Sequence, residues 1–80
     1  MQYTVTLPNI GMTMEEATVV RYCVEPGGTF RAGDPLYEIE TEKVANEVEA
    51  MYDGVMVAHC VAEGDIVQVG GAVCIIETPD

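Results

Sequence analysis

The segment "TVVRYCVEPGGTFRAGDPLYEIE", residues 18–40, returns without a gap as "VMVAHCVAEGDIVQVGGAVCIIE", residues 55–77. Seven of the 23 aligned positions are identical, and they include two glycine pairs, Gly27 with Gly64 and Gly33 with Gly70. A turn that needs a positive φ accepts few residues besides glycine. The aligned turns therefore predict a structural repeat, in which two similar four-stranded units pack around a pseudo-twofold axis.

Short segments rich in β-branched residues lie between glycine and proline residues along the chain. Many short strands with frequent turn signals are typical of an all-β sandwich or barrel, and no stretch keeps a helical period. In the repeat, His59 takes the place of Tyr22, which favours a partly buried, hydrogen-bonded histidine over a catalytic one. Because 80 residues are too few for two cores, we expect one domain over residues 1–80.

The composition narrows the class of partner. Hydrophobic residues make up 49% of the chain, which suits a globular domain, and the formal net charge is -11. Such a field repels phosphate backbones and anionic lipid headgroups, so we expect no binding to nucleic acid or membrane surfaces. No basic residue precedes Arg21, and the longest apolar run is only residues 72–76. We expect a cytoplasmic protein, or an organelle-matrix protein whose transit peptide has been removed.

The residue types offer few catalytic or metal sites. Three separated cysteines and one histidine fit neither a disulfide framework nor a zinc site, so we predict no metal. The chain has no serine, and a cysteine–histidine pair stays open on sequence alone. "GGTFRAGD" has the glycine spacing of a phosphate-binding loop, but Asp34 stands where lysine is needed and no helix is expected to follow. We therefore assign no catalytic residue.

The segment "IETEKVANEVE", residues 39–49, holds the only lysine, Lys43, within the densest run of acids. Glutamates alternate with apolar or small residues on both sides of Lys43, which is the period of half-buried strands with acids outward. Two such strands make a hairpin, with the reversal near Glu42, Lys43 and Val44. The absence of glycine there favours a type I turn in a slightly longer loop. We expect Lys43 to project from the most exposed point.

Two explanations of Lys43 follow from the residues. Carboxylates that oppose each other across a hairpin destabilise it by a few tenths of a kcal/mol up to about 1 kcal/mol per pair. Lys43 could simply relieve that repulsion, since surface ion pairs contribute roughly 0 to 1 kcal/mol. A chain that needs only charge relief would more naturally spread several lysines over the surface. The scarcity of lysine therefore favours a chemical role for this amine, with charge relief as the alternative.

Four segments resemble, in this order, the lipoyl domain of the acyltransferase component of 2-oxo acid dehydrogenase complexes: "LPNIGMTMEEATVVRY", "GDPLYEIETEKV", "EVEAMYDGV" and "VAEGDIVQVG". The resemblance covers about residues 7–76, and "IETEKV" is its most specific part. It implies a flattened β-barrel of two four-stranded antiparallel sheets with quasi-twofold symmetry. The chain departs from the family at three scaffold positions, with Ala17 where glycine is usual, Tyr22 where tryptophan is frequent and Gly28 where aspartate is common.

The resemblance also implies site residues. The modified lysine of the family falls on Lys43, with Glu42 and Val44 beside it. Enzymes that attach lipoate are thought to read the turn together with a glutamate and two glycines, which correspond to Glu40, Gly27 and Gly54. The loop "NIGMTME" resembles the surface by which the decarboxylase recognises its own lipoyl domain; its candidate contact residues are Asn9, Ile10, Gly11, Met12 and Thr13.

If the resemblance holds, the chain is a carrier domain and not itself an enzyme. A lipoate ligase or lipoyl transferase would attach lipoic acid to Lys43. The resulting arm would visit a thiamine-diphosphate-dependent 2-oxo acid decarboxylase, an acyltransferase core and a dihydrolipoyl dehydrogenase. A biotin carrier domain is the nearest alternative, but such domains usually flank the lysine with methionines. The hydrogen carrier of glycine cleavage is longer, and an unmodified acidic β-sandwich adaptor is the alternative from another class.

Overall fold

The computed structural model describes residues 1–9, 15–42 and 45–79, and it contains eight strands and no helix within these ranges. The strands are β1 (Gln2–Thr6), β2 (Glu16–Tyr22), β3 (Thr29–Phe30), β4 (Pro35–Glu40), β5 (Ala45–Glu49), β6 (Gly54–His59), β7 (Ile66–Gln68) and β8 (Ala72–Glu77). Burial alternates along β2 and β7, whereas β4 and β8 each contain two successive buried residues. Strand β4 begins at a proline, which is tolerated there because the first strand residue need not donate a ladder hydrogen bond.

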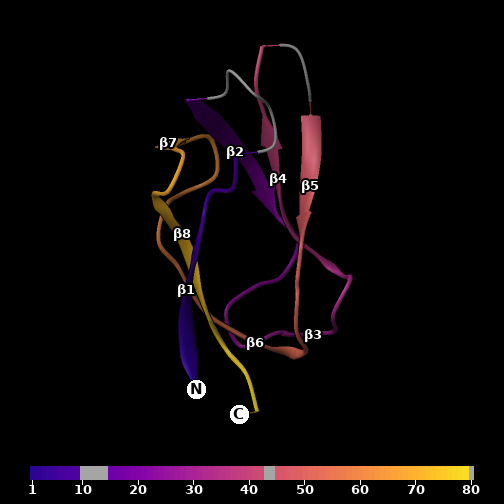
Figure 1. The fold of residues 1–80 in the computed structure, drawn as a ribbon. Helices are drawn as coiled ribbons and strands as arrows, with labels where there is room; N and C mark the ends of the chain where they lie inside the picture. The colour runs from indigo at the N-terminus through magenta and orange to yellow at the C-terminus, as the bar shows by residue number, and fades with distance from the viewer. Residues whose placement is uncertain (10–14, 43–44, 80) are drawn as a thin grey trace.

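The strands form two four-stranded antiparallel sheets, with the orders β1-β8-β6-β3 and β5-β4-β2-β7 (Figure 1). The two orders are equivalent, because β1 corresponds to β5, β8 to β4, β6 to β2 and β3 to β7. The predicted fold class is therefore confirmed.

The pseudo-twofold symmetry extends to the details of the backbone. The four positive-φ residues among those described are glycines at equivalent positions, Gly27 with Gly64 and Gly33 with Gly70. The pairing of β2 with β4 shifts register between Val19 and Arg21, and the pairing of β6 with β8 shifts at the equivalent place, between Met56 and Ala58. The glycine pairs in the sequence thus predicted real turns, and the repeat is structural.

One hydrophobic cluster lies between the sheets. Its most completely buried side chains include Leu36, Ile39 and Met56, as expected for a core built mainly from aliphatic residues. The cluster also contains the fully buried Tyr37 and Cys74, which are equivalent under the repeat, and of these Tyr37 was not expected from the alternating pattern. The cluster consists of Leu7, Ala17, Val19, Phe30, Leu36, Tyr37, Ile39, Ala50, Met56, Val67, Val73, Cys74 and Ile76.

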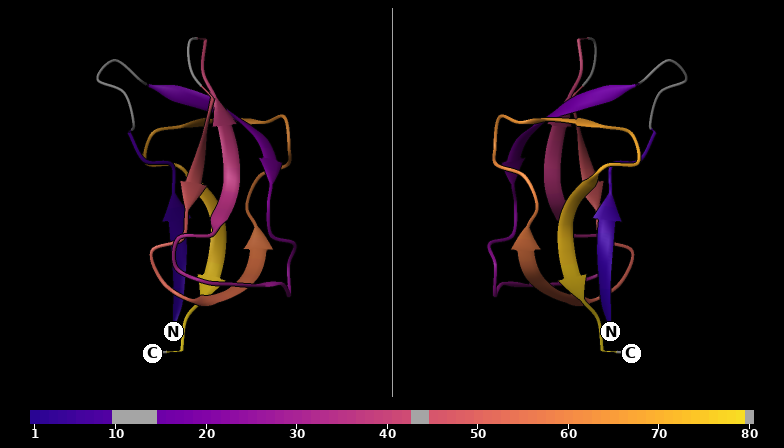
Figure 2. Two further views of the ribbon diagram at one scale, coloured as in Figure 1. Left: turned by 90° about the vertical axis from the view of Figure 1, so that its right-hand side faces the viewer. Right: turned by 90° about the vertical axis from the view of Figure 1, so that its left-hand side faces the viewer.

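The two ends of the molecule differ in what they carry. The chain termini lie together at one end, where the Met1 amine donates to the Thr78 carbonyl over 2.9 Å (Figure 1). The last residue of β4 and the first residue of β5 lie at the other end (Figure 2). No helix in the described part of the chain has the length and apolar character needed to span a membrane.

Candidate carrier hairpin

The β4–β5 hairpin carries the candidate attachment site. Glu40 pairs with Ala45 in antiparallel register, so the chain reverses direction within the four intervening positions, and Lys43 is one of them by sequence. Residues 43 and 44 lie outside the described residues, and the exposure of Lys43 stays a prediction. The residues that flank them in the description, Glu42 and Ala45, are both exposed. The predicted hairpin is confirmed, with β4 starting earlier than the glutamate alternation indicated.

Charged side chains form a row across the face of this hairpin. Glu38 and Glu47 are directly opposed partners of β4 and β5, which confirms the predicted opposition of carboxylates. On the other side of Glu38, β2 places Arg21, whose Nε donates to the Glu38 carboxylate. The hydrogen bond and charge of Glu38 raise the pKa of Arg21, and Glu47 adds a smaller effect in the same direction. Arg21 was not singled out by sequence, because only the β2–β4 register brings it here.

The remaining recognition candidates occupy different parts of the molecule. Glu40 and Glu42 are exposed beside the chain reversal. Asn9 is exposed after β1, and the other four residues of its candidate surface, positions 10–13, lie outside the described residues. Glu40 and Glu42 are therefore close to Lys43 because they precede it by three residues and one residue in the chain.

Gly27 is a turn residue with φ of +90°. Its amide donates to the Met56 carbonyl over 2.7 Å, and the Gly28 carbonyl accepts from the Met56 amide over 2.8 Å. These bonds attach the β2–β3 turn to the middle of β6. Within the described residues, Gly27 therefore has a scaffold role that its conformation alone explains.

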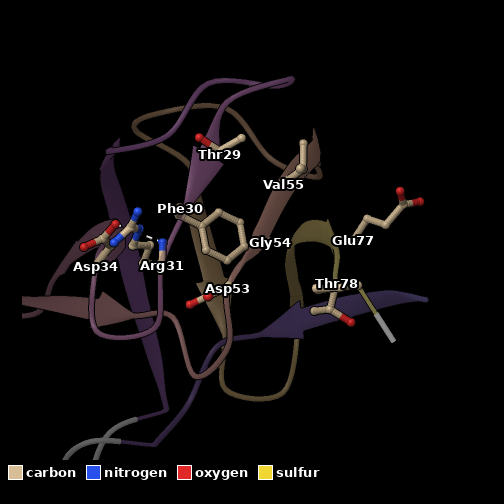
Figure 3. Close-up of a pocket in the computed structure, with 10 residues that line it drawn as sticks. Thr29, Phe30, Arg31, Asp34, Asp53, Gly54, Val55, Glu77 and Thr78 are labelled. Carbon is tan, nitrogen blue, oxygen red and sulfur yellow. Dashed lines mark hydrogen bonds between the residues drawn. The ribbon is translucent and has the colours of Figure 1, made fainter.

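Gly54 lies at the end of the molecule that holds the termini. A Cβ on Gly54 would stand 2.4 Å from the Glu77 carbonyl oxygen and 3.1 Å from the ring of Phe30. A surface pocket of about 600 Å³ opens beside it. Figure 3 shows Gly54 against the ring of Phe30, between two groups of side chains, Arg31 and Asp34 on one side and Glu77 and Thr78 on the other. The structure therefore does not bring Gly54 together with the hairpin end.

The other chemistry-bearing side chains form no further site in the described part of the chain. His59 is partly buried and hydrogen-bonded, as predicted. The three cysteines are free; Cys74 is buried, Cys23 is half-buried and Cys60 is exposed. No group of three or more potential ligands among the described residues could hold a metal ion. After Asp34 the chain enters strand β4 rather than a helix, as expected when "GGTFRAGD" is not a phosphate loop.

Two quasi-symmetric four-stranded sheets, with the only lysine falling by sequence between the paired residues Glu40 and Ala45, define a class of small all-β domains with one candidate attachment site. Within that class, residues 3–78 match the Biotin_lipoyl family, described as "Biotin-requiring enzyme". The chain belongs to this family.

Proteins similar to this chain include components of two dehydrogenase complexes. The chain is 36% identical over 73 residues to the lipoamide acyltransferase component of the branched-chain alpha-keto acid dehydrogenase complex of Bacillus subtilis, covering 91% of this chain and 17% of that protein. It is 32% identical over 80 residues to the dihydrolipoyllysine-residue acetyltransferase component of the pyruvate dehydrogenase complex of Corynebacterium glutamicum, covering 100% of this chain and 12% of that protein. The chain thus spans less than a fifth of the length of these relatives.

A solved structure gives the same result for the fold. The lipoyl domain of the 2-oxoglutarate dehydrogenase complex from Azotobacter vinelandii superposes with a TM-score of 0.78 at 27% identity. The match covers 96% of this chain and 98% of that one, so the likeness includes both sheets. The resemblance to lipoyl domains of 2-oxo acid dehydrogenase complexes is confirmed.

Proposed function

We propose that this domain carries acyl groups and reducing equivalents through lipoic acid bound as an amide to Lys43. Its partners would be a 2-oxo acid decarboxylase that uses thiamine diphosphate, an acyltransferase core and a dihydrolipoyl dehydrogenase. The observation that carries the proposal is the β4–β5 register, in which Glu40 faces Ala45 and the single lysine falls in the reversal between them. The relatives' names, which include lipoamide and dihydrolipoyllysine, support lipoate as the cofactor.

The described residues near the reversal fit a covalently attached arm. An arm that must reach several active sites needs an attachment point without enclosing walls, and Glu42 and Ala45 on either side of the reversal are exposed. When bound, lipoic acid supplies a dithiolane that accepts an acyl group and two electrons. The domain's own contribution is to hold the attachment point between two paired strands, which lowers the conformational entropy lost on docking, and to raise the effective concentration of the arm at each partner.

Each recognition candidate has a place in this proposal. Glu40, Glu42 and Val44 lie beside Lys43 in the chain and are proposed contacts of the lipoate ligase or lipoyl transferase, while Gly27 and Gly54 are proposed to act through the fold. The loop at residues 9–13 is proposed to meet the decarboxylase. As part of such a complex, the domain would work in the bacterial cytoplasm or an organelle matrix, inside an acyltransferase component and without catalysis of its own.

The intact mass of the domain tests the proposal. The chain is co-expressed with a lipoate ligase, and we expect one lipoyl increment on the wild type. Lys43→Arg keeps the positive charge but removes the only side-chain primary amine, so the increment should disappear. An increment on Lys43→Arg would contradict attachment at Lys43.

Biotin is the second candidate, because the matching family is described by biotin-requiring enzymes. A parallel co-expression with a biotin ligase separates the two cofactors by mass. Modification by biotin alone would favour a biotin carboxyl carrier. A folded domain left unmodified by both enzymes would favour the unmodified acidic adaptor.

A further inference from the structure

The two sheets share one backbone plan but differ in charge. The strands of β5-β4-β2-β7 carry one arginine and five glutamates, Glu16, Glu38, Glu40, Glu47 and Glu49. The strands of β1-β8-β6-β3 carry one glutamate, Glu77, and no arginine or lysine. Because the sheets are equivalent, each position on the charged sheet can be compared with the position that has the same place in the backbone of the other sheet.

The difference in charge is clearest in the row of paired residues that contains Arg21, Glu38 and Glu47. Arg21 pairs with Glu38, and Glu38 pairs with Glu47. At the equivalent positions, Ala58 pairs with Ile75, and Ile75 pairs with Thr4. Both rows follow the same register shift, so the backbone forms equally with an uncharged row. The fold therefore does not require charge at these positions.

The charged row also works against stability. Glu38 directly opposes Glu47, and like charges in opposed positions destabilise a strand pair. Arg21 and Glu38 form the one ion pair among the described residues, so the exposed Glu47 interacts with Arg21 only through a smaller long-range effect, and neither Glu47 nor Glu49 has an ion pair there. At the position equivalent to Glu49, strand β1 has the neutral Thr6, since Glu49 follows Val48 at the bulge as Thr6 follows Val5. A destabilising row that the fold does not need indicates a surface kept for a partner.

We propose that the hairpin face, defined as Arg21, Glu38, Glu47 and Glu49, is the docking surface for a basic patch on the enzyme that attaches the cofactor to Lys43. The inference rests on the proposed function and adds the side from which that enzyme approaches. The three glutamates of the face lie on β4 and β5, the strands that the reversal joins, so an enzyme held by the face has the reversal beside it. Complementary charge on such a face chiefly speeds the encounter and orients it.

Kinetics of lipoylation test the face, with full-length domain and purified lipoate ligase. Glu47→Gln should raise KM for the domain about fivefold with kcat unchanged, the factor for about 1 kcal/mol from one charge pair near 4 Å in water. Glu49→Gln should act in the same direction. Glu77→Gln is the matched control, because it removes the same charge from the other sheet, and its KM should stay at the wild-type value. Added salt should raise the wild-type KM more than that of Glu47→Gln.

Stability measured on the same variants separates docking from folding. Glu47→Gln removes the opposition to Glu38, so it should be at least as stable as the wild type while its KM rises. Arg21→Gln should be slightly less stable, yet its KM should fall, because a positive charge has left the face that meets a basic patch. A structural effect would move stability and lipoylation together.

The outcomes distinguish this inference from the function on which it rests. A wild-type domain that the ligase leaves unmodified would overturn the proposed function and the inference with it. A wild-type domain that is modified, with Glu47→Gln and Glu77→Gln giving the same KM, would overturn the inference alone. A fall in KM for Glu47→Gln would overturn it too, since it would show an acidic contact surface on the enzyme.

Discussion

The rings of Tyr22 and His59, which occupy equivalent positions in the two halves of the chain, stack with centroids 3.5 Å apart and planes 4° from parallel. Each also reaches the other half. Tyr22 Oη donates to the Val61 carbonyl over 2.8 Å, and His59 Nε2 donates to the Val24 carbonyl over 2.9 Å. Val24 and Val61 are equivalent in their turn, so the two bonds form a reciprocal pair across the pseudo-twofold axis. A carbonyl only accepts, so His59 carries its proton on Nε2.

The reciprocal pair predicts the effect of Tyr22→Phe. The change keeps the ring stack but removes a hydroxyl that lies 2.8 Å from both the Val61 and the Val73 carbonyl oxygens. We expect the free energy of unfolding to fall by about 1–2 kcal/mol, measured by urea denaturation. Tyr3→Phe is the control, because the Tyr3 hydroxyl is exposed and contacts only the Met1 sulfur in the described structure. Equal stability of the two variants would contradict the prediction.

Tyr37→Phe should change the free energy of unfolding in the opposite direction. Tyr37 is fully buried, and its hydroxyl has no hydrogen-bond partner among the described residues. A buried polar group without a partner is destabilising by about 1–3 kcal/mol, and removing it restores that loss in part. We expect Tyr37→Phe to unfold at the same or a higher urea concentration than the wild type. A clear loss of stability would show that the hydroxyl is bonded after all, for example to an ordered water.

The sequence predicted what depends on local chemistry. Glycines at matching intervals predicted the four positive-φ turns, and alternating glutamates predicted the β4–β5 hairpin. Substitution of His59 for Tyr22 in the repeat predicted a partly buried histidine, but not that the two rings would stack. Stacking depends on the pseudo-twofold axis bringing equivalent strands together, and no local pattern contains that information.

Sequence reasoning missed one residue beside the candidate site for the same kind of reason. Arg21 is far from Lys43 in sequence, and only the register of β2 with β4 reveals its contact with Glu38. Likewise the buried place of Tyr37 depends on a register shift between Pro35 and Tyr37, which puts two successive residues, Leu36 and Tyr37, inside the core. Bulges break the alternation on which the sequence argument relies. Its scarcity and its place among alternating glutamates singled out Lys43, the family resemblance supplied lipoylation as its role, and that role stays a prediction.

Alkaline solution should destabilise the fold through two buried groups. Burial, with a smaller effect of Cys60, raises the pKa of Cys74 from its ordinary 9.0 to about 12. Burial also raises the pKa of Tyr37 above its ordinary 10.0. Both groups are neutral when protonated, and in the folded state they hold their protons to higher pH than in the unfolded state. Their contribution is therefore complete below about pH 9 and is lost as pH rises toward 12.

Urea midpoints measured from pH 8 to pH 11 check this expectation. The wild-type midpoint should fall steadily above pH 9, and Cys74→Ala, although less stable at neutral pH, should lose less over the same range. Cys60→Ala serves as the control, because Cys60 is exposed and adds only the smaller effect on the pKa of Cys74. If Cys74→Ala and Cys60→Ala follow the wild-type slope equally, Cys74 does not govern the alkaline loss.

Gly54 and Gly27 should affect cofactor attachment only through folding. Gly54→Ala places a Cβ 2.4 Å from the Glu77 carbonyl oxygen, and overpacking of this kind destabilises by about 1–3 kcal/mol or more. Gly27→Ala meets no atom within 4 Å, but its φ of +90° disfavours a side chain, at about 1–2 kcal/mol. We expect both variants to lose thermal stability, and Gly54→Ala to lose more.

Lipoylation at two temperatures separates a scaffold role from a contact. Gly54 lies against Glu77 and beside Thr78 near the chain terminus, whereas Glu40 ends β4 and Ala45 begins β5. At a low temperature, where circular dichroism shows the variants to be folded, we expect Gly54→Ala and Gly27→Ala to be modified with nearly the wild-type kcat/KM. At a temperature that partly unfolds them, modification should fall in proportion to the folded fraction. Glu40→Gln, which is beside the reversal, should lower kcat/KM at both temperatures. A folded Gly54→Ala domain that the ligase cannot modify would show that the enzyme contacts this glycine directly.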